Sequence, residues 1–204
     1  MKIEFVNHAS CIFSYDKINL LCDPWIEGNV FNEGWSLLAK SKFSYKDFHR
    51  ITHIWFSHEH PDHFSPPNIN KIDPSYRKNI IVLYRKTNDK KIINYCKKLG
   101  FKDCIELESQ KRYSLSKKFE IMASSIVNDS WLNIKTDKHS ILNMNDCVFK
   151  NTRTGKKIKK IIGDVDLLLT QFSYANKIGN RPDYKKRLNG AKNKINDLVN
   201  QIDV

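Results

Sequence analysis

The 204-residue chain lacks the features that mark membrane-spanning, fibrous and disulfide-bonded secreted proteins. No apolar run approaches the ~20 residues that a membrane-spanning helix needs, and glycine, at 7 residues, is too scarce for a collagen-like chain. The five cysteines are odd in number, scattered and without Cys-x-x-Cys spacing, as expected for reduced thiols. Residues 1–8 contain no apolar signal-peptide core. We therefore expect a cytoplasmic globular protein with no membrane span.

Acidic residues are also scarce, because 22 Asp and Glu stand against 35 Lys and Arg, which gives a net charge of +13. A basic surface attracts anionic partners such as nucleic acids, phosphates or nucleotide sugars. However, the basic residues are mostly lysines that extend along the chain without forming one stripe, whereas phosphate-binding surfaces favour arginine. The charge thus favours compositional drift over nucleic-acid binding and leaves an anionic small-molecule substrate open.

The apolar pattern predicts one α/β domain over residues 1–204, since no Pro/Gly/Ser-rich linker divides the chain. Short strands come first and a mixture of strands and helices follows, which is typical of a layered α/β domain. Strands are expected over residues 2–6, 10–15, 18–22, 51–57, 79–84, 104–107, 112–115, 119–127, 131–136, 140–145 and 165–172. Helices are expected over residues 89–99 and 184–202. The apolar face of the second helix comprises Leu188, Ala191, Ile195, Leu198 and Ile202.

The strongest chemical signal is the segment HEHPDH over residues 58–63, which directly follows an apolar strand. It concentrates three of the seven histidines and one aspartate, and imidazoles and carboxylates are ligands of first-row metals. On a tight turn, His58 and His60 would face one ion. Asp62 and His63 would reach a second ion nearby. A surface loop that is rich in histidine by chance explains this concentration poorly.

The pattern HxHxDH resembles the metal-binding motif of the metallo-β-lactamase fold superfamily. His8-Ala-Ser, Leu21-Cys-Asp-Pro and the segments 141–147 and 164–169 follow in the order of that family's other matching stretches. The resemblance implies a four-layer αββα sandwich. It also implies that Asp23 supports the histidine loop and that Asp146 bridges two metal ions.

Two departures from the family pattern concern the metal ligands. Asp129 stands where most relatives have a histidine as the third protein ligand of the first ion, and this added carboxylate brings iron or manganese into consideration beside zinc. No histidine follows His139, although many relatives have a late histidine that completes the second site. We therefore expect a domain that lacks its last strand or a second site short of one ligand, so that one or two divalent ions bind with unequal affinity.

A narrower resemblance concerns the metallo-β-lactamase-like domain of CMP-N-acetylneuraminate hydroxylases and their bacterial relatives, some of which also carry a Rieske iron–sulfur domain. It is carried by residues 128–130, 141–147 and 166–173. A Rieske cluster needs two Cys and two His in paired spacing. Residues 1–204 contain no Cys-x-His…Cys-x-x-His pattern.

Four functions compete on this evidence. The first is a metal-dependent hydrolase, in which a metal-activated water attacks an ester, phosphodiester or amide of an anionic substrate and Asp62 both binds metal and orients the water. The second is an iron-dependent oxygenase or sugar-modifying enzyme related to the hydroxylase. The third is a nucleic-acid processing or binding protein, whose nuclease branch is disfavoured by the absence of room for an added domain. The fourth is an inactive protein of the same fold.

The remaining histidines and the loop aromatics receive weaker assignments. His8 lies at a strand turn and is assigned a structural role in preference to a place in the pocket. His53 is expected in the core and His139 on the surface. The aromatic residues of the loop after Asp23 are expected either to line a substrate pocket or to pack in the core; they are Trp25, Phe31 and Trp35.

Overall fold

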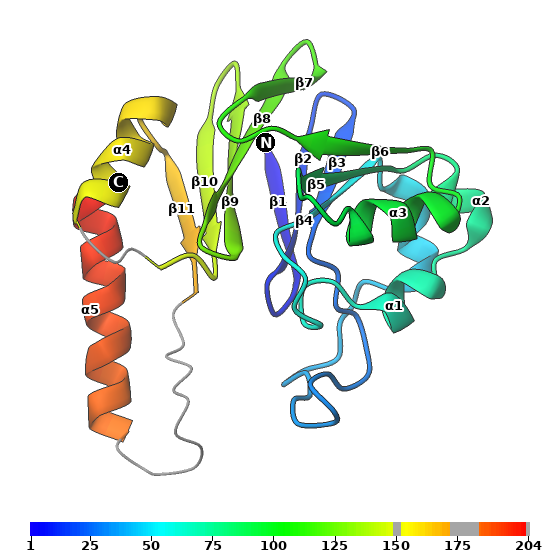
Figure 1. Ribbon diagram of the computed structural model, residues 1–204, viewed down its shortest axis with the longest axis horizontal. Coiled ribbons are helices and arrows are strands. Elements are labelled where there is room, and N and C mark those ends of the chain that lie inside the picture. The colour runs from blue at the N-terminus through cyan, green and yellow to red at the C-terminus, as the bar shows by residue number, and fades with distance from the viewer. Residues whose placement is uncertain (149–151, 172–183, 203–204) are drawn as a thin grey trace.

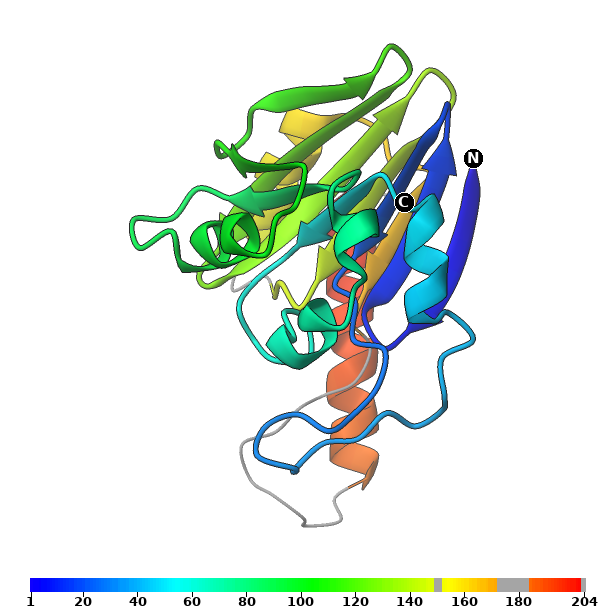
Figure 2. The same ribbon diagram turned by 90° about the vertical axis from the view of Figure 1, so that its right-hand side faces the viewer.

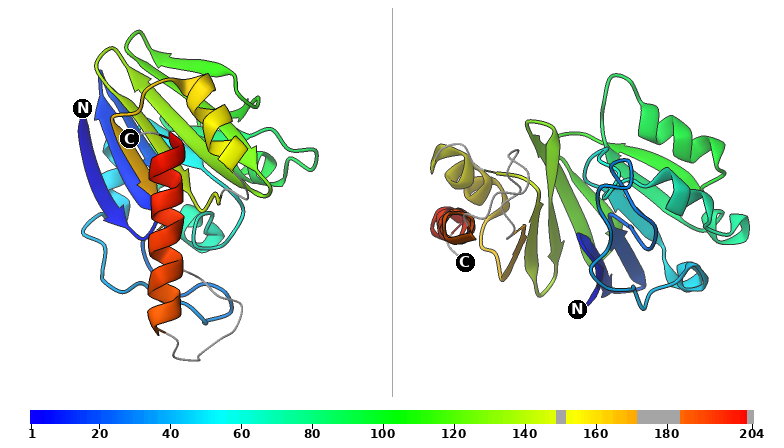
Figure 3. Two further views of the ribbon diagram at one scale, coloured as in Figure 1. Left: turned by 90° about the vertical axis from the view of Figure 1, so that its left-hand side faces the viewer. Right: turned by 90° about the horizontal axis from the view of Figure 1, so that it is seen from below.

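The computed structural model of the protein describes residues 1–148, 152–171 and 184–202. Two β-sheets lie face to face, with helices on the outer side of each, so that the layers follow the order helix, sheet, sheet, helix (Figure 1; Figure 3, right). The αββα sandwich implied by the sequence is therefore confirmed.

The first sheet has the strand order β1-β2-β3-β4-β5-β6. Its strands are β1 (Lys2–Asn7), β2 (Ser10–Tyr15), β3 (Ile18–Cys22), β4 (His53–Phe56), β5 (Ile81–Arg85) and β6 (Asp103–Leu107). β1, β2 and β3 form an antiparallel meander, and β3 to β6 run parallel to one another. The outer face is covered by a 3₁₀ helix, η1 (Tyr45–Arg50), with α1 (Pro66–Asn70), α2 (Pro74–Arg77) and α3 (Lys91–Lys98), the last three of which lie in front of the sheet in Figure 2.

The second sheet has the order β11-β10-β9-β8-β7. Its strands are β7 (Arg112–Ser116), β8 (Phe119–Ile126), β9 (Asp129–Thr136), β10 (Ser140–Asn145) and β11 (Leu167–Thr170). From β7 to β10 each strand pairs antiparallel with the next, and β11 pairs parallel with β10. Two helices, α4 (Thr152–Ile162) and α5 (Tyr184–Ile202), cover its outer face (Figure 3, left).

The side-chain alternation of the strands creates three separate apolar layers. In β4, Ile54 and Phe56 pack toward the helices α1 and α3, while Trp55 between them packs toward the second sheet, as the two-residue period of a strand requires. In the second sheet, Leu132 faces the first sheet, and Leu142 faces α4 and α5. Each sheet is thus buried on both faces, which explains the near-continuous apolar runs in the sequence.

The strand directions bring distant parts of the sequence to one edge of the sandwich. β1 runs antiparallel to β2, which runs antiparallel to β3, so β1, β3 and β4 all point the same way. The residues that follow these three strands therefore lie at the same edge of the sheet. They are His8, Asp23 and the segment 57–63.

Several elements differ from those expected, and the short helices η1, α1 and α2 were not predicted. The helix α4 was not predicted, because its core-facing stripe is only Ile158 and Ile162 within a lysine-rich segment. The helix α3 begins at Lys91, two residues later than expected, because Lys90 adopts the left-handed conformation (φ 50°). The strand expected over residues 165–172 extends over Leu167–Thr170, and Phe172 and the side chain of Leu188 lie outside the described residues. No helix in the described part of the chain is both long and apolar enough to cross a membrane.

Candidate metal centre

The HEHPDH segment forms a tight turn directly after β4. The backbone N–H groups of His63 and Phe64 both donate to the carbonyl oxygen of His60, at 2.9 and 2.8 Å. This turn buries His58, Asp62 and His63, whereas His60 stays exposed. Four potential ligand side chains are thereby gathered within six residues at the edge of the sandwich.

A first group of ligand atoms comes from His58, His60 and Asp129. His58 Nε2 lies 2.8 Å from His60 Nδ1 and 3.5 Å from Asp129 Oδ1. Asp129 reaches the motif because β9 begins with it at this edge. The atoms of all three residues fall within 4.8 Å of one another, which is close enough for one ion.

Asp146 lies between this group and the rest of the motif. Its Oδ2 is 3.4 Å from His63 Nε2, and it forms a further potential ligand group with His58 and His63. The residue follows the last residue of β10, whose carboxyl end meets the amino end of antiparallel β9. The structure thus puts Asp146 between the two halves of the motif, where the resemblance assigns it the bridging role.

A second group of ligand atoms comes from Asp62, His63 and His8. The sequence analysis had assigned His8 a structural role. His8 Nε2 lies 3.0 Å from Asp62 Oδ2, which in turn lies 3.3 Å from His63 Nε2. All three residues offer ligand atoms within 4.8 Å of one another. The sequence analysis did not use the strand directions, which would have placed His8 at the site. A residue at the carboxyl end of β1 lies at the same sheet edge as the residues that follow β3 and β4, which run parallel to it.

Asp23 supports the histidine loop through hydrogen bonds to its residues. Its carboxylate accepts hydrogen bonds from the Ser57 backbone N–H (2.7 Å), the Ser57 hydroxyl (2.8 Å) and the side-chain amide of Asn145 (2.6 Å). Its Oδ2 also lies 3.1 Å from His63 Nδ1, the kind of contact expected between Asp23 and a motif histidine. Sequence reasoning missed the amide of Asn145, which ties the second sheet to this contact.

The orientation of the imidazoles suits metal binding. With the Nδ1 proton of His63 directed to Asp23, its Nε2 lone pair faces Asp62 and Asp146. Within the described residues, His63 Nε2 and Asp62 Oδ1 are buried atoms without a hydrogen-bond partner. Leaving such atoms unpaired is costly, so their position beside other ligand atoms fits a bound cation.

The charges of the site are strongly coupled. Burial on its own would lower the pKa of His63, but three neighbouring carboxylates raise that pKa well above its usual value. These carboxylates belong to Asp146, Asp23 and Asp62. Burial lowers the pKa of His58 to about 4, so His58 is a neutral ligand at pH 7. Burial and the charge of Asp146 raise the pKa of Asp129.

Aromatic side chains of the loop after Asp23 lie against the histidines. The ring of Trp25 packs edge-on to His8 at 5.2 Å, and that of Phe31 lies 6.2 Å from His60. Trp25 is buried, whereas Phe31 is 40% and Trp35 is 45% exposed. Trp25 therefore packs in the core, which is one of the two roles expected for this loop, and Phe31 and Trp35 lie partly exposed beside the histidines.

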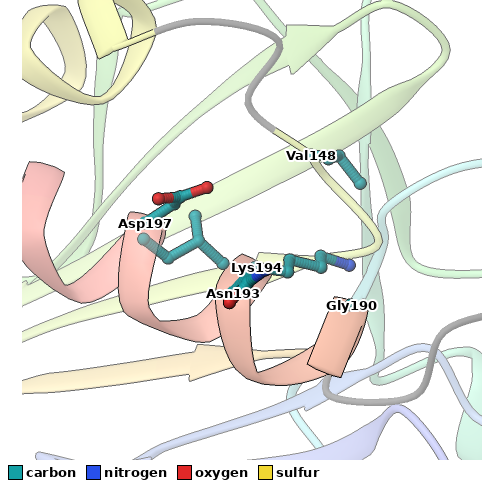
Figure 4. A pocket seen from close by; sticks show the side chains of 6 residues that line it. Val148, Gly190, Asn193, Lys194 and Asp197 are labelled. Carbon is teal, nitrogen blue, oxygen red and sulfur yellow. The ribbon is translucent and has the colours of Figure 1, made fainter. Parts of the chain in front are cut away.

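A lysine from the last helix lies on the other side of the site. Lys194 lines a cavity of about 200 Å³ between α5 and Val148 (Figure 4), and its ammonium group donates to Gln171 Oε1 at 2.8 Å. Burial lowers the pKa of Lys194, although the nearby charges of Asp146 and Asp129 act to raise it. Lys194 is therefore a half-buried cation that is close enough to the two carboxylates to interact with their charges. His53 is buried in β4 and His139 is exposed, and neither belongs to the site.

Comparisons of sequence agree with this chemistry but cover part of longer proteins. No family model matches the chain. It is 23% identical over 156 residues to a putative Rieske 2Fe-2S iron–sulfur protein of Mycolicibacterium smegmatis, a match that covers 72% of this chain. It is 27% identical over 103 residues, 50% of this chain, to the cytidine monophosphate-N-acetylneuraminic acid hydroxylase of Xenopus laevis. The matches cover 30% and 17% of these relatives' own lengths.

Solved structures share the fold over most of the chain. CmlA, a diiron β-hydroxylase from Streptomyces venezuelae, matches 98% of this chain and 42% of its own with a TM-score of 0.72 and 18% identity. An isothiocyanate hydrolase from Delia radicum gut bacteria matches 87% of this chain and 74% of its own, with a TM-score of 0.64 and 14% identity. YhfI of Bacillus subtilis, described as a metallo-β-lactamase fold protein, matches 83% and 65% with a TM-score of 0.56 and 15% identity. This shared architecture shows that the chain has the metallo-β-lactamase fold.

Proposed function

We propose that the protein is a non-haem iron enzyme that uses O₂ to hydroxylate a small anionic molecule. The observation that carries this proposal is the first ligand group, in which His58, His60 and Asp129 supply two imidazoles and one carboxylate. Two histidines and one carboxylate with open positions are typical of iron(II) oxygenases, and some zinc hydrolases share this donor set. The likeness to the diiron hydroxylase and to hydroxylase sequences supports the same choice.

The residues of the site divide the work of holding the metal. His58, His60 and Asp129 would hold one ion, Asp62 and His63 a second, and Asp146 would lie between the two. Bound iron supplies the redox chemistry with O₂. Asp23 fixes the ring of His63, and Ser57 accepts the Nδ1 proton of His58 at 2.9 Å, so that both imidazoles keep their metal-binding nitrogens free.

The other side chains around the site would select and orient the substrate. Lys194 is the half-buried cation beside Asp146 and Asp129, and we propose that it binds a carboxylate or phosphate group of the substrate. The exposed rings of Phe31 and Trp35 would cover the apolar part of that molecule. A site to which the described residues contribute one such lysine suits a small molecule better than a nucleic acid, whose binding rests on many phosphate contacts. All five cysteines are free, which supports the proposed cytoplasmic location.

Hydroxylation by O₂ requires two electrons for each turnover, which reduce the second oxygen atom to water. Residues 1–204 contain no paired Cys-x-His and Cys-x-x-His sequences for a Rieske cluster. We propose that these electrons come from an iron–sulfur centre outside these residues. Relatives named as Rieske iron–sulfur proteins, of which the chain matches about a third, support this source.

A metal-dependent hydrolase is the second candidate function. It is favoured by the position of Asp146 between two ligand groups, since two ions sharing a carboxylate also serve hydrolytic enzymes. In that case Asp62 would orient a metal-activated water toward an ester, phosphodiester or amide, and zinc or manganese would serve. The shared fold with an isothiocyanate hydrolase is compatible with this alternative.

Metal content and oxygen uptake separate the two candidates. The protein is purified from cells grown without added metal, its metals are determined, and the iron(II)-loaded form is mixed with O₂ and a chemical reductant. We expect iron as the main metal, uptake of O₂ and an iron(III) spectrum that returns to iron(II) on reduction. Zinc as the main metal, no O₂ uptake and turnover of p-nitrophenyl acetate or bis(p-nitrophenyl) phosphate would favour the hydrolase.

A further inference from the structure

We propose that His8 is a ligand of the second metal ion and takes the place that the sequence leaves open after His139. The inference depends on the proposed function only in requiring a metal centre, and it holds for an oxygenase and a hydrolase alike. It assigns a direct binding role to a residue that the strand pattern alone indicates to be structural.

The spacing of the ligand atoms carries the argument. Atoms bonded to one ion at about 2.0–2.1 Å lie about 2.8–3.4 Å apart when the bond angles are octahedral or tetrahedral. His8 Nε2 lies 3.0 Å from Asp62 Oδ2, and Asp62 Oδ2 lies 3.3 Å from His63 Nε2. The two edges that Asp62 forms with the histidines therefore have the lengths of a metal coordination shell, and all three ligand atoms lie within 4.8 Å of one another.

Two buried atoms independently indicate a ligand at this place. The side chains of His63 and Asp62 are 0% and 5% exposed, and in the described residues His63 Nε2 and Asp62 Oδ1 have no hydrogen-bond partner. A hydrogen bond from His8 to Asp62 satisfies only Oδ2 and leaves both of these atoms unpaired. A cation among the three residues would contact His63 Nε2 and balance the charge of Asp62.

The surroundings of His8 hold its ring toward the site. Trp25 packs edge-on against the imidazole at 5.2 Å, and Trp35 also lies edge-on to it at 6.5 Å. The side chain is 34% exposed, so an ion can reach it from solvent. These rings restrict the rotation of the imidazole, which lowers the entropy that is lost on binding.

The assignment changes the expected affinities. With His8, the second ion would have two imidazoles and one carboxylate, the same donor set as the first ion, and both would share Asp146. Because the donor sets are alike, we expect two ions with affinities within roughly tenfold of each other, which corresponds to about 1.4 kcal/mol. The inequality between the affinities of the two ions, which the sequence predicts, would then disappear.

Zinc titration of the metal-free protein tests the assignment without reference to the reaction. Wild-type protein should bind two Zn²⁺ per chain, and His8→Gln should bind one tightly and the second roughly 100-fold or more weakly, beyond the range typical for loss of a mere supporting contact. Glutamine still donates a hydrogen bond to Asp62, so a role limited to that bond would leave two tight ions and overturn the proposal. His139→Gln, an exposed histidine away from the site, is the matched control and should keep both ions.

A measurement on the wild-type chain guards against a variant that misfolds. With ¹⁵N-labelled histidine, the Nε2 signal of His8 should shift as Zn²⁺ is added up to two equivalents and then stay constant. The signal is assigned by its absence in His8→Gln. An unshifted His8 signal at two equivalents would overturn the proposal even if the variant lost metal, and it would leave the iron and oxygen test of the proposed function unaffected.

Discussion

Asp23 Oδ2 and His63 Nδ1 lie 3.1 Å apart, with both side chains completely buried, although 40 residues separate them in sequence. The contact joins the end of β3 to the turn after β4, and it fixes which nitrogen of His63 carries the proton. Because Asn145 donates to the same carboxylate oxygen at 2.6 Å, the second sheet is tied to this contact as well. The orientation of one imidazole therefore depends on three strands.

Asp23→Asn should weaken metal binding by roughly 10–100-fold, the usual cost of losing a carboxylate partner of a metal-binding histidine. The amide can no longer accept the His63 proton with the strength of a charged group, so the ring loses its fixed tautomer. Zn²⁺ affinity by chelator competition measures the effect, and circular dichroism shows whether the fold persists. Asp164→Asn, at an exposed aspartate, should leave affinity unchanged; equal affinity in Asp23→Asn would reject the supporting role.

Asp129→His should change the metal preference of the first site. The substitution converts two imidazoles and a carboxylate into three imidazoles, which favours zinc over iron(II). The ratio of zinc to iron, measured after equilibration with both metals under anaerobic conditions, should rise, and O₂ uptake should fall. The control is Asp137→His, at an exposed aspartate in the β9–β10 turn. An unchanged metal ratio in Asp129→His would place Asp129 outside the coordination shell.

The layered fold and most of the candidate site could be predicted from the sequence, because both depend on patterns of residues that lie close together along the chain. Alternating and continuous apolar runs identified the strands, and HEHPDH contains four potential ligands within one turn. The helix over Tyr184–Ile202 was predicted with the bounds that the structure shows, since Leu198 and Ile202 follow the helical period and are buried on the sheet.

What the sequence could not supply is the meeting of residues that are far apart along the chain. His8 is a single histidine beside a turn, and its closeness to Asp62 depends on the direction of β1 relative to β4. Asn145 likewise reaches Asp23 only because the two sheets face each other. Lys194 is one of 28 lysines, and only the packing of α5 distinguishes it from the exposed ones.

Lys194→Gln should weaken the binding of anions to the metal-loaded protein. Removing one partner of a charged hydrogen bond costs about 1.5–3 kcal/mol, or roughly 10–100-fold in affinity. Inorganic phosphate and acetate are suitable probes, and isothermal titration of the zinc-loaded protein measures their affinity. Lys192→Gln is the matched control, because Lys192 lies exposed on the same helix. Equal anion affinity in Lys194→Gln and wild type would remove Lys194 from the proposed substrate site.

Metal binding should release a proton, and affinity should rise with pH beyond the range of an ordinary histidine. In the metal-free protein the neighbouring carboxylates raise the pKa of His63 well above its usual 6.5, so His63 is protonated at pH 7 and a metal must displace that proton. Each displaced proton makes affinity fall about tenfold per pH unit below the raised pKa. His58, whose pKa burial lowers to about 4, adds no such dependence at neutral pH.

The measurement is the Zn²⁺ affinity between pH 6 and pH 9 by competition with a chelator of known pH dependence, together with titration calorimetry in two buffers of different ionisation enthalpy. We expect affinity to keep rising above pH 7 and close to one proton to be released per chain at that pH. A plateau that begins near pH 6.5, with no proton released at pH 7, would show that His63 is already neutral there. The carboxylates around it would then be oriented for the metal without holding a proton in its place.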